Sequence, residues 1–125
     1  MPLNGCKILV VEDEYLIAED LAALLRDAHA DVIGPAESLP QAMRLAADTE
    51  LIDAAVLDIN LRGVTVFPLA DELTSRSIPI MFLTGYGENN IPEEYGEIVC
   101  CEKPMGVTHI VAQLQAILNP TTAAA

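Results

Sequence analysis

The sequence predicts an α/β fold, a parallel β-sheet covered by helices on both faces, and three features of the chain support this class. Short runs of strand length are apolar at nearly every position, as in strands whose two faces are both buried. The segments between most of these runs place apolar residues three or four positions apart, which is the spacing of a helix face. Strands that alternate with helices form right-handed βαβ units and therefore lie parallel. The clearest runs are residues 8–11, 54–57, 80–83 and 98–101.

Five strands are expected. The second is short, Val32 and Ile33, because Gly34-Pro35 is a turn signal that closes it. The fourth begins at Ile78-Pro79, since the first position of a strand tolerates proline. The expected strands are residues 6–12, 32–33, 53–58, 78–83 and 98–101.

Four helices are expected between and after these strands. Ser38 opens the second one, and Gln41 three residues later suggests a capping box. Pro68 suits an early position of the third. Residues 85–97 are barely long enough for a parallel crossover and show no helical periodicity, so an irregular segment with one turn near residues 92–95 is expected. The helices are residues 14–29, a segment starting at Ser38, residues 68–75 and residues 106–118.

Units of this kind fit a flavodoxin-like, doubly wound five-stranded parallel sheet with strand order 2-1-3-4-5 and an irregular fourth crossover. A chain of 125 residues is the size of one ordinary domain. We therefore expect a single domain over residues 1–125, with a core at about 6–118 and a frayed tail at 119–125.

The composition restricts the partners. The net charge of −13, from 6 Lys and Arg against 19 Asp and Glu, disfavours nucleic acids and anionic membranes. No apolar run approaches the ~20 residues that span a bilayer, and the N-terminus does not resemble a signal peptide, so a cytoplasmic location is expected. The three cysteines, Cys6, Cys100 and Cys101, have no metal-ligand spacing and are interpreted as buried, reduced, small apolar residues.

Reactive side chains follow the predicted strands at the points where the strands end. Ligands of open parallel sheets bind outside the carboxyl ends of the strands, so these side chains are expected to meet. They are Glu12 and Asp13 after the first strand, Asp58 at the end of the third, Thr84 after the fourth and Lys103 after the fifth.

Three carboxylates in one place require compensation. At an effective dielectric of ~20, two like charges ~4 Å apart repel by about 4 kcal/mol, and Lys103 supplies one positive charge. Mg²⁺ prefers oxygen ligands and often shares one or two carboxylates with a phosphate, and the backbone carbonyl of Asn60 could be a further ligand. A carboxylate beside Mg²⁺ can attack phosphorus and become an acyl phosphate, with Thr84 and Lys103 as positioned donors.

This set of residues, in its order and spacing, resembles the receiver domain of two-component response regulators over essentially the whole chain. The resemblance implies a five-stranded (βα)₅ fold and a Mg²⁺ site formed by three side chains and one backbone carbonyl. The residues that carry the resemblance are Glu12-Asp13, Asp58, Thr84 and Lys103-Pro104. The implied Mg²⁺ ligands are Glu12, Asp13, Asp58 and the carbonyl of Asn60.

The same resemblance implies the roles in phosphorylation. Asp58 is the expected phosphoacceptor, taking a phosphoryl group from a phosphohistidine on a histidine kinase or a histidine phosphotransfer protein. Thr84 and Lys103 would bind the phosphoryl oxygens. The protein would not be an enzyme beyond self-phosphorylation and slow autodephosphorylation. It would signal to a downstream protein target through the side formed by residues 84–118.

One departure from the family concerns the switch. Receivers usually carry an aromatic residue three positions before the lysine, and Cys100 stands there. Residues 82–86 resemble the Phe-Ala-Thr-Gly stretch of an alphaproteobacterial subgroup in which that aromatic is also absent. The candidates for switching are therefore Tyr86, Cys100 and Pro104.

Alternatives remain open at this stage. Asp13 could only cap the first helix, and Asp58 could only form a turn. The chain could be a receiver-like binding module that works without phosphorylation, or a phosphatase resembling the haloacid dehalogenase group, although Asn60 replaces the second acidic residue of those enzymes. A stand-alone receiver, a piece of a hybrid kinase, a monomer and a dimer are all consistent with the sequence.

Overall fold

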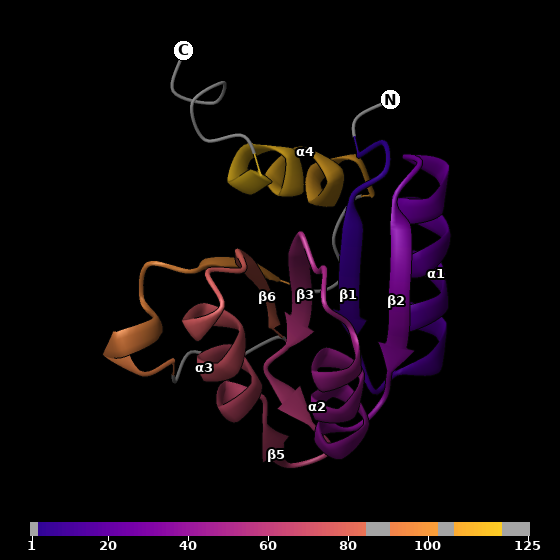
Figure 1. The fold of residues 1–125 in the computed structure, drawn as a ribbon. Helices are drawn as coiled ribbons and strands as arrows, with labels where there is room; N and C mark the ends of the chain where they lie inside the picture. The colour runs from indigo at the N-terminus through magenta and orange to yellow at the C-terminus, as the bar shows by residue number, and fades with distance from the viewer. Residues whose placement is uncertain (1–2, 85–90, 103–106, 119–125) are drawn as a thin grey trace.

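The computed structural model describes residues 3–84, 91–102 and 107–118, and they form a five-stranded parallel sheet between two layers of helices (Figure 1). The order along the sheet is β2-β1-β3-β6-β7, with every neighbouring pair parallel, which confirms the predicted doubly wound topology. The strands of this sheet are β1 (Lys7–Val11), β2 (Asp31–Ala36), β3 (Ala54–Asp58), β6 (Ile80–Thr84) and β7 (Val99–Glu102).

The helices divide the apolar side chains into two cores. Alternate strand residues point to opposite faces, so Leu9 joins one core and Ile8 the other. Helices α2 (Leu39–Asp48) and α3 (Phe67–Ser75) cover the first face, while α1 (Tyr15–Asp27) and α4 (Val107–Leu118) cover the second. Strands covered on both faces explain why the central runs are apolar throughout. Among the described residues no helix combines the length and apolarity needed to cross a membrane.

Helix α2 begins close to where the capping signal places it. Ser38 is the N-cap, and its hydroxyl accepts a hydrogen bond from the Gln41 backbone N–H at 3.3 Å. The Gln41 side chain accepts from the backbone N–H of Glu37 at 3.1 Å, one residue before the partner that a capping box uses. The predicted box is therefore half confirmed.

Strand β2 is longer than the sequence predicts. Gly34-Pro35 was expected to end the strand, but the strand continues to Ala36. The register moves from Leu9↔Ile33 to Val11↔Ala36, so β2 holds one more residue than β1 across this step, a bulge. Because β2 is at the edge of the sheet, the missing N–H of proline is tolerated there.

The crossover between β6 and β7 contains no α-helix within its described part. A single 3₁₀ turn, η1 (Glu93–Tyr95), confirms the one turn expected near residues 92–95. Strand β6 begins at Ile80, so Ile78-Pro79 precedes the strand instead of starting it. The expected tail, residues 119–125, lies outside the described residues.

The expectation that all three cysteines are buried is wrong for Cys100. Cys101 is buried with its sulfur 3.6 Å from that of Met81, Cys6 is half-buried and Cys100 is exposed. Cys100 and Cys101 are neighbours on a strand and therefore face opposite sides of the sheet. On the Cys100 side the described crossover offers no α-helix to cover the thiol.

A small hairpin follows β3, and the sequence did not predict it. Strands β4 (Asn60–Leu61) and β5 (Val64–Thr65) pair antiparallel around a two-residue turn. Both turn residues, Arg62 and Gly63, have positive φ, +54° and +87°, as a type I′ turn requires. The hairpin therefore reverses the chain immediately after Asp58, before α3 begins.

Candidate functional site

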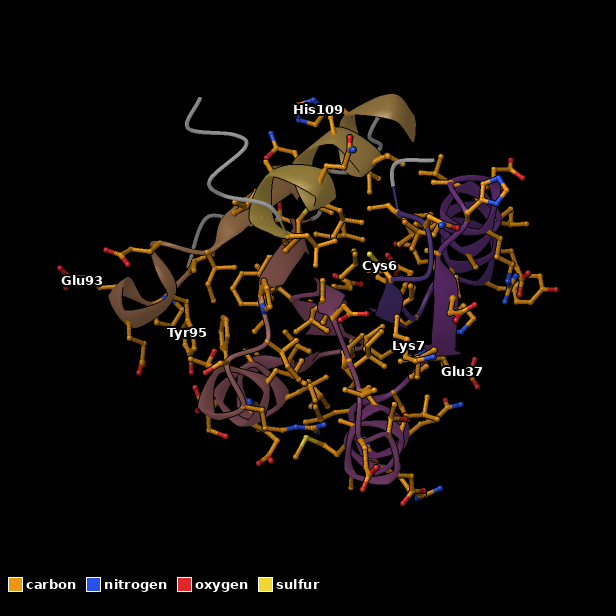
Figure 2. The ribbon with its side chains drawn as sticks, turned by 45° about the horizontal axis from the view of Figure 1, so that its top comes forward. Cys6, Lys7, Glu37, Glu93, Tyr95 and His109 are labelled. Carbon is orange, nitrogen blue, oxygen red and sulfur yellow. The ribbon has the colours of Figure 1, made fainter. Side chains whose placement is uncertain are left out.

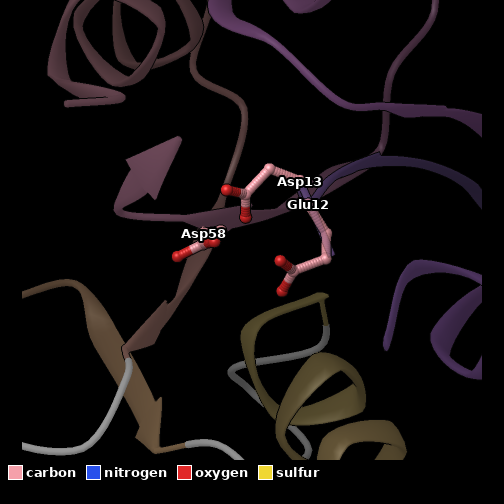
Figure 3. A group of neighbouring side chains, drawn as sticks. All are labelled: Glu12, Asp13 and Asp58. Atoms are coloured by element: carbon pink, nitrogen blue, oxygen red, sulfur yellow. The ribbon is translucent and has the colours of Figure 1, made fainter. Parts of the chain in front are cut away.

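The register of the sheet brings three carboxylates together. Val11 pairs with Leu57, so the next residues, Glu12 and Asp58, reach the carboxyl edge at the same level. Asp13 follows in the loop that leads to α1. One ligand oxygen from each of Glu12, Asp13 and Asp58 lies within 4.8 Å of the other two (Figure 3). The predicted convergence is therefore present in the structure.

The backbone around these carboxylates helps to orient them. Glu12 and Asp58 are 1% and 3% exposed, whereas Asp13 is half-buried and accessible from solvent. The N–H of Glu14 donates to Glu12 Oε2 at 3.0 Å, and the N–H of Asn60 donates to Asp58 Oδ1 at 3.3 Å. Asp58 thus makes a local turn contact and at the same time faces the other two carboxylates.

Asp13 does not act as the cap of α1. The N-cap residue is Glu14, and Asp13 Oδ2 instead accepts a hydrogen bond from the N–H of Arg62 at 3.1 Å. The N–H of Gly63 in turn donates to Asn60 Oδ1 at 2.6 Å. The Arg62 bond ties the β4–β5 hairpin to the acidic cluster, and the Gly63 bond closes the turn within the hairpin. The role of the Arg62 backbone was missed from sequence, and the only signal for it is the glycine that follows.

The donor set fits a hard divalent cation. If all three carboxylates are ionised, each pair at this separation repels by about 3–4 kcal/mol at an effective dielectric of ~20. Carboxylate oxygens that converge with two of their residues buried match what Mg²⁺ or Ca²⁺ binds. Among the described residues this is the one such group of three acidic, histidine or cysteine side chains.

Thr84 lies at the neighbouring strand end, as expected. Asp58 pairs with Leu83 across β3 and β6, which places Thr84 one residue beyond that level. The N–H of Ile59 donates to the carbonyl of Leu83 at 3.1 Å and ties the two strand ends together. Thr84 is 4% exposed and pairs with Glu102 on β7. The predicted site and switch residues Tyr86, Lys103 and Pro104 lie outside the described residues.

The acidic cluster adjoins a hollow of about 220 Å³ between the start of α1, the end of β2 and the start of α2. Two of the three cluster carboxylates, those of Glu12 and Asp13, line it. The acidic cluster is therefore next to a cavity on this side. The lining residues are Glu12, Asp13, Tyr15, Ala18, Glu19, Pro35, Glu37 and Gln41.

A doubly wound sheet with converging acids and a strand-end threonine defines the class of receiver-like proteins, and a family comparison agrees. The model of the response regulator receiver domain matches residues 8–115, so the chain belongs to the response regulator receiver domain family.

Particular relatives are similar over most of the chain. The phyllosphere-induced regulator PhyR of Methylorubrum extorquens is 30% identical over 113 residues, which are 86% of this chain and 42% of PhyR. The transcriptional regulatory protein PdtaR of Mycobacterium tuberculosis is 26% identical over 117 residues, 90% of this chain and 57% of PdtaR. The chain thus spans about half the length of these curated relatives.

Among solved structures, the solution structure of SdrG from Sphingomonas melonis Fr1 is similar, with a TM-score of 0.80 and 33% identity, covering 94% of this chain and 98% of SdrG. A response regulator structure from Chloroflexus aurantiacus has a TM-score of 0.79 and 26% identity, covering 92% of this chain and 98% of that one. These similarities agree with the predicted family and fold.

Proposed function

We propose that this protein is the phosphoacceptor receiver of a two-component phosphorelay, with Asp58 as the phosphorylated residue. The observation that supports this most is the convergence of Glu12, Asp13 and Asp58 at the carboxyl edge of a receiver fold. The phosphodonor would be a phosphohistidine on a histidine kinase or a histidine phosphotransfer protein.

The transfer is a substitution at phosphorus. A carboxylate oxygen of Asp58 attacks the phosphorus and forms the O–P bond, while the P–N bond to the donor imidazole breaks. The imidazole leaves with the electron pair of that bond and takes up a proton. The Thr84 hydroxyl and the Lys103 ammonium would donate to the phosphoryl oxygens, where charge develops during transfer.

A bound Mg²⁺ would neutralise negative charge on the phosphoryl group and on the acids around it. Its ligands would be the side chains of Glu12, Asp13 and Asp58 and the backbone carbonyl of Asn60. If Glu12 and Asp13 are ionised, an anionic phosphoryl donor would meet less repulsion once the cation is present.

The signal would leave through protein contacts on the side formed by residues 84–118. Phosphorylation would bring Thr84 against the phosphoryl group, and Thr84 is where the β6–β7 crossover starts. The acidic composition suits a basic surface on the downstream partner. We place the protein in the cytoplasm, as one receiver domain over residues 1–125, without enzymatic activity beyond its own phosphorylation and slow dephosphorylation.

Incubation with acetyl phosphate, with Mg²⁺ or with EDTA, followed by intact-mass measurement, tests this function. We expect an adduct of about 80 Da that needs Mg²⁺ and is absent from Asp58→Asn. Asp48→Asn is the matched control, because it removes the same charge from an exposed position at the end of α2.

Two results would contradict the proposal. Mg²⁺ binding without any adduct on Asp58 would indicate a binding module that works without phosphorylation. Continuous turnover of a small phosphate ester by the pure protein would indicate a phosphatase.

A further inference from the structure

Tyr95 packs the described part of the β6–β7 crossover against α3 and β6. Its ring stacks on Phe67 with centroids 4.5 Å apart and planes 9° from parallel, and it meets Phe82 edge-on at 6.2 Å. Phe67 and Phe82 are also in edge contact, at 5.9 Å. Tyr95 is 8% exposed and extends from η1 toward helix α3, whereas Glu93 of the same turn points outward (Figure 2). Aromatic pairs in these geometries stabilise beyond the area that they bury.

The tyrosine hydroxyl adds a directional contact to helix α3. It donates a hydrogen bond to Asp71 Oδ1 at 2.7 Å, a short, charge-assisted bond. This bond, together with burial, raises the pKa of Tyr95 to about 12. The hydroxyl therefore keeps its proton, and remains a donor, throughout the neutral range.

The aromatic contact reaches the strand that carries Thr84. Phe82 precedes Thr84 by two positions on β6, so both side chains leave the same face of the sheet. On the neighbouring strand, the residue in register with Phe82 is Cys100, which is small and exposed. The aromatic side chain that packs on Phe82 from the crossover is consequently Tyr95.

The β6–β7 crossover starts after Thr84, which lies at the proposed phosphoryl site. Near its other end, Tyr95 packs against the aromatic residues of α3 and β6. When one event restricts a segment, a second event that needs the same restriction costs less conformational entropy, so the two favour each other. Docking of Tyr95 and the contact of Thr84 with a phosphoryl group would both restrict the β6–β7 crossover, so each should favour the other.

We propose that Tyr95 is a positioning residue of the switch: its docking on Phe67, Phe82 and Asp71 and the binding of a phosphoryl group at Asp58 strengthen one another. This inference rests on the proposed function of Asp58 and names a residue through which that site is regulated. By linkage, the docked state must bind the phosphoryl group more tightly than the undocked state, by the same factor by which phosphoryl binding favours docking.

The test is the affinity of the full chain for beryllofluoride, a phosphoryl mimic, in the presence of Mg²⁺. Tyr95→Phe keeps the ring and removes only the hydrogen bond to Asp71. We expect it to bind beryllofluoride about five-fold more weakly, with the affinity for Mg²⁺ alone changed less than about two-fold. In the wild type, beryllofluoride should slow amide exchange at residues 91–98, and in Tyr95→Phe it should slow it less.

A second variant changes Asp71, the acceptor of the hydrogen bond. Asp71 is exposed on α3, so its substitution is not expected to prevent folding. Asp71→Ala should match Tyr95→Phe, whereas Asp71→Asn, which keeps an acceptor oxygen, should restore most of the affinity. Arg76→Ala is the control for general loss of stability: it removes contacts to the end of α2 and should leave beryllofluoride binding unchanged.

The two proposals fail in different ways. A wild-type protein that binds Mg²⁺ but no beryllofluoride would overturn the proposed function, and the inference with it. A wild type that binds beryllofluoride, with Tyr95→Phe and Asp71→Ala binding it equally well, would overturn the inference alone. Loss of affinity in Arg76→Ala to the same extent would also overturn it, by showing that affinity follows stability.

Discussion

At Gly34 the backbone has a φ of +101°, a conformation that residues with a side chain rarely adopt. A Cβ built there would lie 2.8 Å from the backbone N of Ala36 and 2.9 Å from the carbonyl oxygen of Val10. Neither backbone atom can move without disturbing the β1–β2 pairing. Gly34→Ala is therefore expected to lower the free energy of unfolding by about 2–4 kcal/mol in urea denaturation, from strain plus overpacking.

Substitution of Gly5 measures the backbone strain without the overpacking. Gly5 also has positive φ, +75°, but a Cβ there would meet no atom within 4 Å. Gly5→Ala should then cost only the conformational part, about 1–2 kcal/mol. Equal losses for the two variants would mean that the close approach in β2 relaxes without cost.

The ionisation of Tyr95 gives a prediction about pH. Because the folded-state pKa is about 12 and the ordinary value is 10, the hydrogen bond to Asp71 stabilises the fold below pH 10. That stabilisation is lost as the pH rises from 10 through 12, where the phenol ionises in the folded state. In a titration of absorbance at the tyrosinate band, Tyr95→Phe should lose a step near pH 12. Disappearance of a step near pH 10 instead would contradict the buried bond.

At the level of the element, helix α2 depends on a side chain from another helix. The guanidinium of Arg76, the C-cap residue of α3, donates to the carbonyls of Ala46 at 2.8 Å, Thr49 at 2.8 Å and Glu50 at 3.2 Å. These bonds bring a positive charge to the C-terminal end of α2, where helix carbonyls lack partners within the helix.

Arg76→Ala should accordingly lower the free energy of unfolding by about 1–3 kcal/mol, because hydrogen bonds from a charged group are lost together. Arg76→Lys should recover only part of this, since an ammonium cannot reproduce the planar fork. Thermal unfolding followed by circular dichroism measures both. Arg44→Ala, an exposed arginine on α2 itself, is the matched control and should change stability by less than about 0.5 kcal/mol.

The elements that sequence patterns predicted are those whose patterns come from burial. The central strands are apolar because both faces are covered, and their ends are marked by the acids that follow. The sequence predicts too short a β2 because Gly34-Pro35 is ordinarily a turn. The pair is acceptable in this strand because β2 lies at the edge of the sheet and contains a bulge. The hairpin after Asp58 was missed because its two-residue strands are too short to show alternation.

The expectation for Cys100 was wrong for a different reason. Its burial was expected because the cysteines have no metal-ligand spacing and free cysteine is usually a buried, small apolar residue. A strand face loses its cover where the crossover beside it has no α-helix, as in the described part of this one, and this leaves the thiol of Cys100 exposed. The stacking of Tyr95 could not be predicted, because it depends on the path of an irregular segment. The spacing of apolar residues predicts strands and helices, but it does not predict the path of an irregular segment.

For the whole molecule, the acidic site was predictable because topology, not local pattern, brings its parts together. Once the strand order is 2-1-3, side chains that follow the first and third strands must meet at one edge. A molecule whose net charge is −13 thereby gathers three of its 19 acidic residues at one point. If the three carboxylates are ionised, their repulsion lowers the free energy of unfolding, and a cation bound between them would restore it.

Binding of Mg²⁺ should consequently raise the melting temperature. At ten times its dissociation constant, a ligand specific for the folded state adds about 1.4 kcal/mol, or roughly 3–6 °C for a domain of this size. Sodium chloride at the same ionic strength should raise it less, since screening acts weakly on partly buried charges.

Two variants distinguish a cation bound at the three carboxylates from an effect of the net charge of the protein. Asp13→Asn keeps an oxygen that can accept from the Arg62 N–H but removes one like charge. It should melt no lower than the wild type without metal, and Mg²⁺ should no longer raise its melting temperature. Asp48→Asn, which removes the same charge from the end of α2, should keep the full response to Mg²⁺. If Asp48→Asn lost the response as well, the stabilisation would arise from the net charge of the molecule and not from a cation held by the three carboxylates.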